Sequence, residues 1–229
     1  MSYHFDFSTI NVSTLATLGE GMLVSCKITA VALGFGVVLG TFVAMMNLSR
    51  LRLLNMIARF YVDMFRSIPL VLVLLWFFLV VPQILQTLFE LSPTVDVRMA
   101  SALVAFSLFE TAYFSEIIRA GIQSISQGQH SAAFALGMTR AQSMRLIVLP
   151  QALRNMLPLL LTQAIVLFQD TALVYVSALS DFFGRAYGIG ERDGRIVEML
   201  LFAGGVYFVL CFTVSNLVKL YQHRIALQK

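Results

Sequence analysis

Five long apolar runs dominate the chain and limit it to one class of fold. Three contain no charged residue: Ile28 to Ser49, Ser67 to Phe89 and Met199 to Val218. Met99 to Ser115 and Asn155 to Ser180 are each interrupted by a single carboxylate. Because a helix needs about 20 mostly apolar residues to cross the hydrocarbon core, the pattern predicts an all-α integral membrane protein with five transmembrane helices. They are expected near residues 24–47, 60–82, 98–120, 153–177 and 197–221.

The composition excludes the other main classes. Of 229 residues, 59% are apolar and 12% are charged, whereas a soluble domain is about 25% charged. Two cysteines cannot make a disulfide scaffold, and the scattered basic residues give no patch for a nucleic acid. Residues 1–229 are therefore expected to form a single transmembrane domain.

The basic residues predict the orientation of the chain. Most of them fall in the first and third connections or in the C-terminal tail. They are Arg50, Arg52, Arg59, Arg66, Arg119, Arg140, Arg145, Arg154, Lys219, Arg224 and Lys229. Since basic residues stay on the cytoplasmic side, we expect the N-terminus outside and the C-terminus in the cytoplasm. The outer connections carry acidic residues such as Glu90 and Asp96, which agrees, and Arg66 is expected to anchor the second span at the inner interface.

Small residues recur every four positions along the first span, at Ala32, Gly36, Gly40 and Ala44. They share one helix face, and small residues at this spacing let two membrane helices approach closely. The pattern predicts that this face packs against another helix.

Two prolines and one polar segment leave alternatives open. Pro69 and Pro158 lie within the second and fourth spans, where proline kinks a helix. Each is either a packing kink or a bend that shapes a substrate path. Gly184 to Gly194, with alternating charges, is either an exposed loop or interfacial helix, or a docking site for an external partner.

The connection between the third and fourth spans, about residues 121–150, is longer than a turn requires. Ser126 and Gln129 fit a capping box, which opens a helix of small residues. Gly137 is placed to end that helix.

A second capping box, at Thr139 and Gln142, predicts another short helix that runs toward Pro150. Small side chains on the first helix would let it enter a partner's groove, and Arg140 and Arg145 would meet acidic groups there. The alternative is a surface helix pair without a partner.

This loop resembles the "EAA" coupling loop of ATP-binding-cassette (ABC) importer permeases. That pattern is E-A-A, three residues, G, nine residues and I-x-L-P. The spacing fits at every step, except that Ser131 replaces the glutamate and so removes one charged contact to the ATPase. The resemblance implies that seven residues couple the chain to an ATPase. They are Ser131, Ala132, Ala133, Gly137, Arg140, Arg145 and Pro150.

Three further blocks resemble the polar amino-acid branch of these permeases: Phe65 to Leu70, Ala112 to Gly121 and Gln169 to Leu173. Within that branch, Phe106 to Ser126 and Leu159 to Tyr175 are most similar to a permease subunit of bacterial glutamate/aspartate importers. The resemblance implies alternating access that moves glutamate or aspartate from a binding protein to the cytoplasm. Glutamine or another polar amino acid is the alternative substrate.

The resemblance also implies a complex in the bacterial inner membrane, with the outer loop, about residues 178–197, in the periplasm. The implied partners are a cytoplasmic ATPase dimer, a second permease subunit, identical or homologous, and a periplasmic amino-acid-binding protein. The chain has no GxxxxGK[ST] motif, so ATP and Mg are expected on the ATPase, and the chain is a transport subunit and not an enzyme. No metal site is expected, because His4, His130 and His223 are far apart in the sequence.

Asp170 is the leading substrate-binding candidate, because an ionisable residue inside a membrane is costly and usually functional. Gln163 lies seven residues earlier and shares its helix face. In the related permeases the matching positions look toward the bound amino acid. Asp170 would accept the α-ammonium, and Gln163 would meet the side-chain end. The alternatives are an ion pair or helix cap for Asp170 and an interhelical hydrogen bond for Gln163.

Glu110 and Tyr113, three residues apart, face together on the third span and are further candidates for the path. The alternative for Tyr113 is a packed aromatic residue. No Lys or Arg lies near the middle of the fourth or fifth span, so an acidic substrate lacks an evident cationic partner. The Thr171 hydroxyl, exposed backbone N–H groups or the second permease would have to supply donors, and glutamine fits this polar set at least as well.

Overall fold

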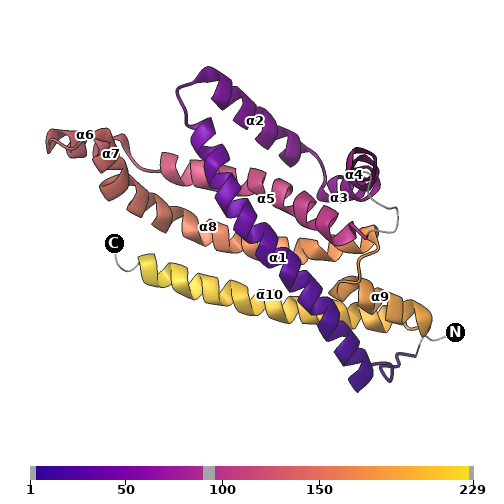
Figure 1. The fold of residues 1–229 in the computed structure, drawn as a ribbon. Helices are drawn as coiled ribbons and strands as arrows, with labels where there is room; N and C mark the ends of the chain where they lie inside the picture. The colour runs from indigo at the N-terminus through magenta and orange to yellow at the C-terminus, as the bar shows by residue number, and fades with distance from the viewer. Residues whose placement is uncertain (1–3, 90–95, 227–229) are drawn as a thin grey trace.

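Only helices occur in the part of the chain that the computed structural model describes, residues 4–89 and 96–226 (Figure 1). Glu90 and Lys229, which entered the orientation argument, lie outside it. The elements in chain order are α1 (Val12–Asn47), α2 (Arg52–Ser67), α3 (Leu70–Leu79), α4 (Val81–Phe89), α5 (Arg98–Gln123), α6 (Gln127–Ala135), α7 (Arg140–Ser143), the π-helical turn η1 (Met144–Val148), α8 (Leu149–Asp170), the 3₁₀ segment η2 (Thr171–Ser177), α9 (Phe182–Arg192) and α10 (Ile196–Ala226).

Five helical stretches within the described residues are long and apolar enough to cross a membrane, which confirms the expected number. They are Val12–Asn47, Leu70–Leu88, Arg98–Gln123, Arg140–Ser177 and Ile196–Leu220. The second begins later than the predicted 60–82. Figure 1 shows α6, α7 and the C-terminus at one end of the molecule, and α9 at the other.

Pro69 breaks the second span instead of kinking it. Proline disfavours the helical conformation in the residue before it, and Ile68 is extended at φ −110° and ψ 132°. As a result α2 ends at Ser67, and α3 runs in a different direction (Figure 1). By contrast, α8 continues through Pro158. The break leaves Arg66 one residue from the end of α2.

The small-residue face of α1 packs against α5, as predicted. Its four members are all buried: Ala32, Gly36, Gly40 and Ala44. Phe114 of α5 lies over Gly36 and Gly40, where a Cβ atom would meet its ring or its Cβ within about 3 Å. Phe114 is itself completely buried. The contact therefore depends on the absence of side chains along this face.

The α1–α5 contact predicts opposite effects for the same substitution on two faces of α1. A Cβ at Gly40 would lie 3.0 Å from both Phe114 Cβ and the backbone nitrogen of Ser115, so Gly40→Ala should destabilise the protein by about 1–3 kcal/mol. At Gly34 nothing lies within 4 Å, so Gly34→Ala should be neutral or stabilising, because alanine favours helix. Thermal unfolding in detergent measures both, and equal shifts would contradict the packing.

The segment Gly184 to Gly194 belongs largely to α9, a helix that packs against α1 and α10. Asp181 caps α9, since its side chain accepts hydrogen bonds from the backbone N–H groups of Gly184 at 2.9 Å and Phe183 at 3.2 Å. The carboxyl group is completely buried, and this burial raises the pKa of Asp181 from 3.8 to about 6. The cap therefore has a cost in free energy, because the buried site disfavours the ionised form of Asp181.

The raised pKa of Asp181 predicts a pH-dependent effect of Asp181→Asn. The folded state holds the proton more tightly than the unfolded chain, so the group's contribution to stability falls as the pH rises from about 4 to 6. Asparagine keeps a capping oxygen without the charge. The variant should exceed wild type in stability by about 1–3 kcal/mol above pH 6, and by little near pH 4. Unfolding midpoints at the two pH values test this, and a pH-independent difference would contradict it.

Candidate substrate cavity and coupling loop

A cavity of about 440 Å³ lies between α2, α3, α5 and α8. Polar side chains reach it from three of these helices, and Pro69 at the helix break forms part of its wall. The polar side chains that carry the argument below are Arg66, Tyr113, Gln163 and Asp170. The cavity therefore gathers a cation, a phenol, an amide and a carboxylate from distant parts of the chain.

Arg66 is the residue of this cavity that the sequence did not predict. Its guanidinium carbon lies 5.5 Å from the centre of the Tyr113 ring, a distance typical of a cation–π contact. It makes no ion pair or hydrogen bond with the described residues. Arg66 lines the cavity wall, and its expected place at the inner interface of the membrane stays a prediction. The signal that could have found it is a charge three residues before a proline in an apolar run.

Asp170 is the last residue of α8 and is half-buried on the cavity wall. Two alternatives for it were an ion pair and a helix cap. Within the described residues it forms no ion pair, and its side chain does not cap the following segment η2. The carboxylate therefore has neither of these two roles among the described residues.

Gln163 lines the cavity and also makes an interhelical hydrogen bond. Its Nε2 donates to the carboxylate of Glu110, at 3.1 Å to Oε2 and 3.4 Å to Oε1. Glu110 has no exposed surface and does not form part of the cavity wall. Tyr113, also on α5, reaches the cavity and packs against Phe109, with 5.1 Å between ring centres. Glu110 and Tyr113 were both candidates to line the substrate path. In the structure Tyr113 lines the cavity, whereas Glu110 does not and instead accepts a hydrogen bond from Gln163.

Thr171 lies outside this cavity. It is completely buried, and its hydroxyl donates to the backbone carbonyl of Phe168 at 2.7 Å. The described residues also contain no group of three or more His, Cys, Asp or Glu side chains that could hold a metal ion.

The predicted coupling loop begins with α6, which ends at Ala135, and Gly137 terminates it as predicted. Gly137 has a φ of 76°, a left-handed conformation that glycine adopts without strain. The N–H of Met138 bonds the carbonyl of Ala133, and the N–H of Gly137 bonds that of Phe134, which is the Schellman arrangement. Ser126 makes no side-chain cap, so the first predicted capping box is wrong.

The second predicted capping box is confirmed. Gln142 N–H donates to Thr139 Oγ1 at 3.3 Å, and Thr139 N–H donates to Gln142 Oε1 at 2.8 Å. The helix that follows is not a separate short helix, however. It passes through η1 and continues into α8, because Pro150 stands in the first turn of α8, where proline needs no hydrogen-bond partner.

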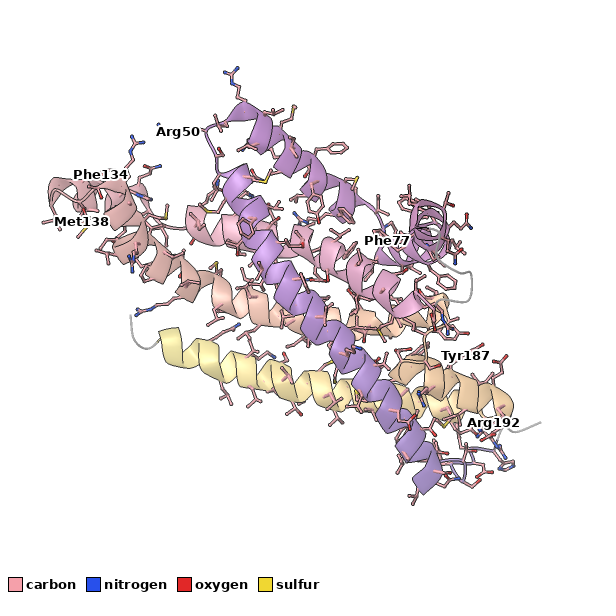
Figure 2. The ribbon with its side chains drawn as sticks, in the orientation of Figure 1. Arg50, Phe77, Phe134, Met138, Tyr187 and Arg192 are labelled. Atoms are coloured by element: carbon pink, nitrogen blue, oxygen red, sulfur yellow. The ribbon has the colours of Figure 1, made fainter. Side chains whose placement is uncertain are left out.

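Most of the predicted coupling residues are exposed. Ala133 is buried, whereas the other six are exposed: Ser131, Ala132, Gly137, Arg140, Arg145 and Pro150. Apolar side chains are exposed beside them, with Leu136 78% and Phe134 46% accessible. Figure 2 shows Phe134 and Met138 at the tip of the molecule. This end therefore offers an apolar surface flanked by arginines.

The fold and these two regions define a polytopic membrane transport protein. Residues 36–227 match the family described as "Binding-protein-dependent transport system inner membrane component". The chain belongs to this family. It is thus a multi-pass inner-membrane permease subunit of an ABC transporter, not an enzyme, and the family implies a separate ATPase and a separate substrate-binding protein.

Individual relatives agree over nearly the whole chain. The glutamate/aspartate import permease protein GltK of Escherichia coli O6:H1 is 59% identical over 98% of this chain and 100% of its own length. The arginine transport system permease protein ArtQ of Bacillus subtilis is 35% identical over 97% of this chain and 98% of its own length. The crystal structure of an amino acid ABC transporter with histidines matches 97% of this chain and 100% of its own, with a TM-score of 0.86 and 31% identity.

Proposed function

We propose that this chain imports glutamate and aspartate, with the amino acid bound in the cavity between Arg66 and Asp170. The observation that carries the proposal is that a guanidinium and a carboxylate line one cavity and form no ion pair with each other or with another described residue. Arg66 is exposed and Asp170 is half-buried, and an unpaired carboxylate inside a membrane protein is costly. A zwitterionic ligand that spans the two groups would satisfy both.

The cavity offers a place for each part of an amino acid. Arg66 would bind the α-carboxylate, because a guanidinium matches a carboxylate in a bidentate fashion. Asp170 would accept the α-ammonium. Gln163 is seven residues away, or about 10 Å of helix rise, and would meet the end of the substrate side chain.

One observation of the cavity favours an acidic substrate over glutamine. Glu110 stands outside the cavity, which reduces the repulsion of a second carboxylate. Arg66 supplies the cation that the fourth and fifth spans lack, but it serves the α-carboxylate that all these substrates share. The 59% identity with a glutamate/aspartate permease points the same way. Glutamine or another polar amino acid is the alternative, because Gln163 and Asp170 also suit a neutral side chain.

The two ends of the molecule suggest how the chain is oriented in the membrane and where its partners bind. The α6/α7 end, with exposed Arg140 and Arg145, would lie in the cytoplasm together with the C-terminus, and α9 with the N-terminus would face the periplasm. The apolar surface around Phe134 and Leu136 would bind one subunit of an ATPase dimer, which carries ATP and Mg. A second permease, identical or homologous, would complete the pathway, and residues 1–229 would act as one permease domain without a cofactor of its own.

Uptake in proteoliposomes tests the function directly. The full complex, with ATP inside the vesicles and the binding protein outside, is offered labelled glutamate, aspartate and glutamine. ATP-dependent uptake of the two acidic amino acids in preference to glutamine is expected. Preference for glutamine would overturn the substrate assignment, and no amino-acid uptake by an intact complex would overturn the function.

Removing either cavity charge should weaken transport. Because a hydrogen bond to a charged group contributes about 1.5–3 kcal/mol, Arg66→Gln and Asp170→Asn should each raise the KM for glutamate about tenfold or more. Arg59→Gln is the matched control, since Arg59 is exposed on the same helix and outside the cavity. Equal effects of Arg66→Gln and Arg59→Gln would contradict the role of Arg66.

The turn at Gly137 should be required for coupling to the ATPase. A residue with a Cβ is destabilised by about 1–2 kcal/mol in the left-handed conformation, and a β-branched residue is destabilised more. Gly137→Val should therefore displace α6. It should reduce both uptake and the ATP hydrolysis that the binding protein stimulates. Gly137→Asn should retain both, since asparagine tolerates this conformation. Normal uptake by the valine variant would show that the turn does not position the ATPase-binding surface.

A further inference from the structure

Glu110 is the one carboxylate of the third span, and it is completely buried at the middle of α5. On one side it meets α1, where a Cβ on Gly36 would lie 3.1 Å from the Glu110 Cβ. On the other side it accepts the hydrogen bonds of Gln163 from α8. The carboxylate is therefore enclosed between two helices, and among the described residues it accepts hydrogen bonds from the side chain of Gln163 alone.

This position is a poor one for a carboxylate if stability alone is considered. Within the described residues no cation pairs with Glu110. A buried acidic group without a cation is less favourable than an apolar residue of the same volume, which would fill the space without a desolvation penalty. Packing and stability therefore do not explain why a glutamate occupies position 110.

The effect of Glu110 on its surroundings is on the orientation of the Gln163 amide, whose hydrogen bonds it accepts. A glutamine side chain on a cavity wall has several rotamers, and its amide can present either its oxygen or its nitrogen to a ligand. In the structure both carboxylate oxygens of Glu110 accept from Nε2 of Gln163, at 3.4 Å for Oε1 and 3.1 Å for Oε2. Glu110 thus holds Nε2 of Gln163 toward α5 and leaves Oε1 and one N–H for whatever occupies the cavity.

We propose that Glu110 is a positioning residue for substrate selection, which acts on the amino acid only through Gln163. This inference rests on the proposed function, in which Gln163 meets the end of the substrate side chain. Arg66 and Asp170 bind the α-carboxylate and α-ammonium that all amino acids share. Glu110 therefore governs the choice between side chains more than the binding of the common head group.

A double-mutant cycle in the reconstituted complex tests the proposal. The variants are Glu110→Leu, which fills the space without an acceptor, Glu110→Gln, which keeps an acceptor oxygen, Gln163→Leu, and the double variant Glu110→Leu/Gln163→Leu. The KM and the maximal rate of ATP-driven uptake are measured for glutamate, aspartate and glutamine. ATP hydrolysis and the yield of assembled complex are measured alongside.

The expected result is a change in KM that depends on Gln163. Glu110→Leu should raise the KM of the preferred substrate about tenfold, which corresponds to about 1.4 kcal/mol, with the maximal rate and ATP hydrolysis nearly unchanged. The ratio of the KM values for glutamate and glutamine should change with it. Glu110→Gln should remain within about threefold of wild type, and the double variant should be no worse than Gln163→Leu, because coupled residues are not additive.

Other outcomes overturn the proposal. Full additivity of the two leucine substitutions, equal effects of Glu110→Leu and Glu110→Gln, or an unchanged KM with a reduced maximal rate would each assign Glu110 a structural role. If the leucine variant does not assemble, Glu110→Met, which is unbranched and apolar, takes its place in the same cycle. Wild-type complex that imports no amino acid would overturn the proposed function itself, whereas uptake by wild type with additive variants overturns only the role of Glu110.

Discussion

The close contact between α1 and α5 is the constraint on which the rest of the structure depends. Phe114 lies against Gly36 and Gly40, at a separation that no larger residue permits, and this contact holds α5 in place. From α5, Glu110 and Phe109 then extend toward α8 and the cavity. Since lipid provides no hydrophobic drive for helices to associate, close packing and a few buried hydrogen bonds must supply the stability.

The cavity differs from this closely packed contact, because two of its charged side chains, Arg66 and Asp170, form no ion pair with each other. Arg66 and Asp170 share one space of about 440 Å³ and form no ion pair, although Asp170 is half-buried and a cation would offset the cost of its burial. Gln163 has a hydrogen-bond partner, Glu110, which lies outside the cavity. The cavity therefore has a mixed polar and apolar lining, with a cation and a carboxylate that are not paired with each other.

A continuous helical path joins the cavity to the predicted coupling loop. The chain is helical from Arg140 through η1 and α8 to Asp170, so a displacement at the exposed α7 end would reach Gln163 and Asp170 along one element. The π-helical turn η1 widens this path locally, and such turns are frequent at functional sites.

The sequence by itself determined the features that depend on neighbouring residues. The number of apolar helices, the small-residue face of α1, the left-handed turn at Gly137 and the shared face of Gln163 and Asp170 follow from local periodicity and backbone sterics. Only the tertiary structure decided that the break at Pro69 brings Arg66 to Tyr113, and that Glu110 stands behind Gln163. Those contacts join residues about 50 positions apart, and their geometry depends on how the helices pack, which no local pattern records.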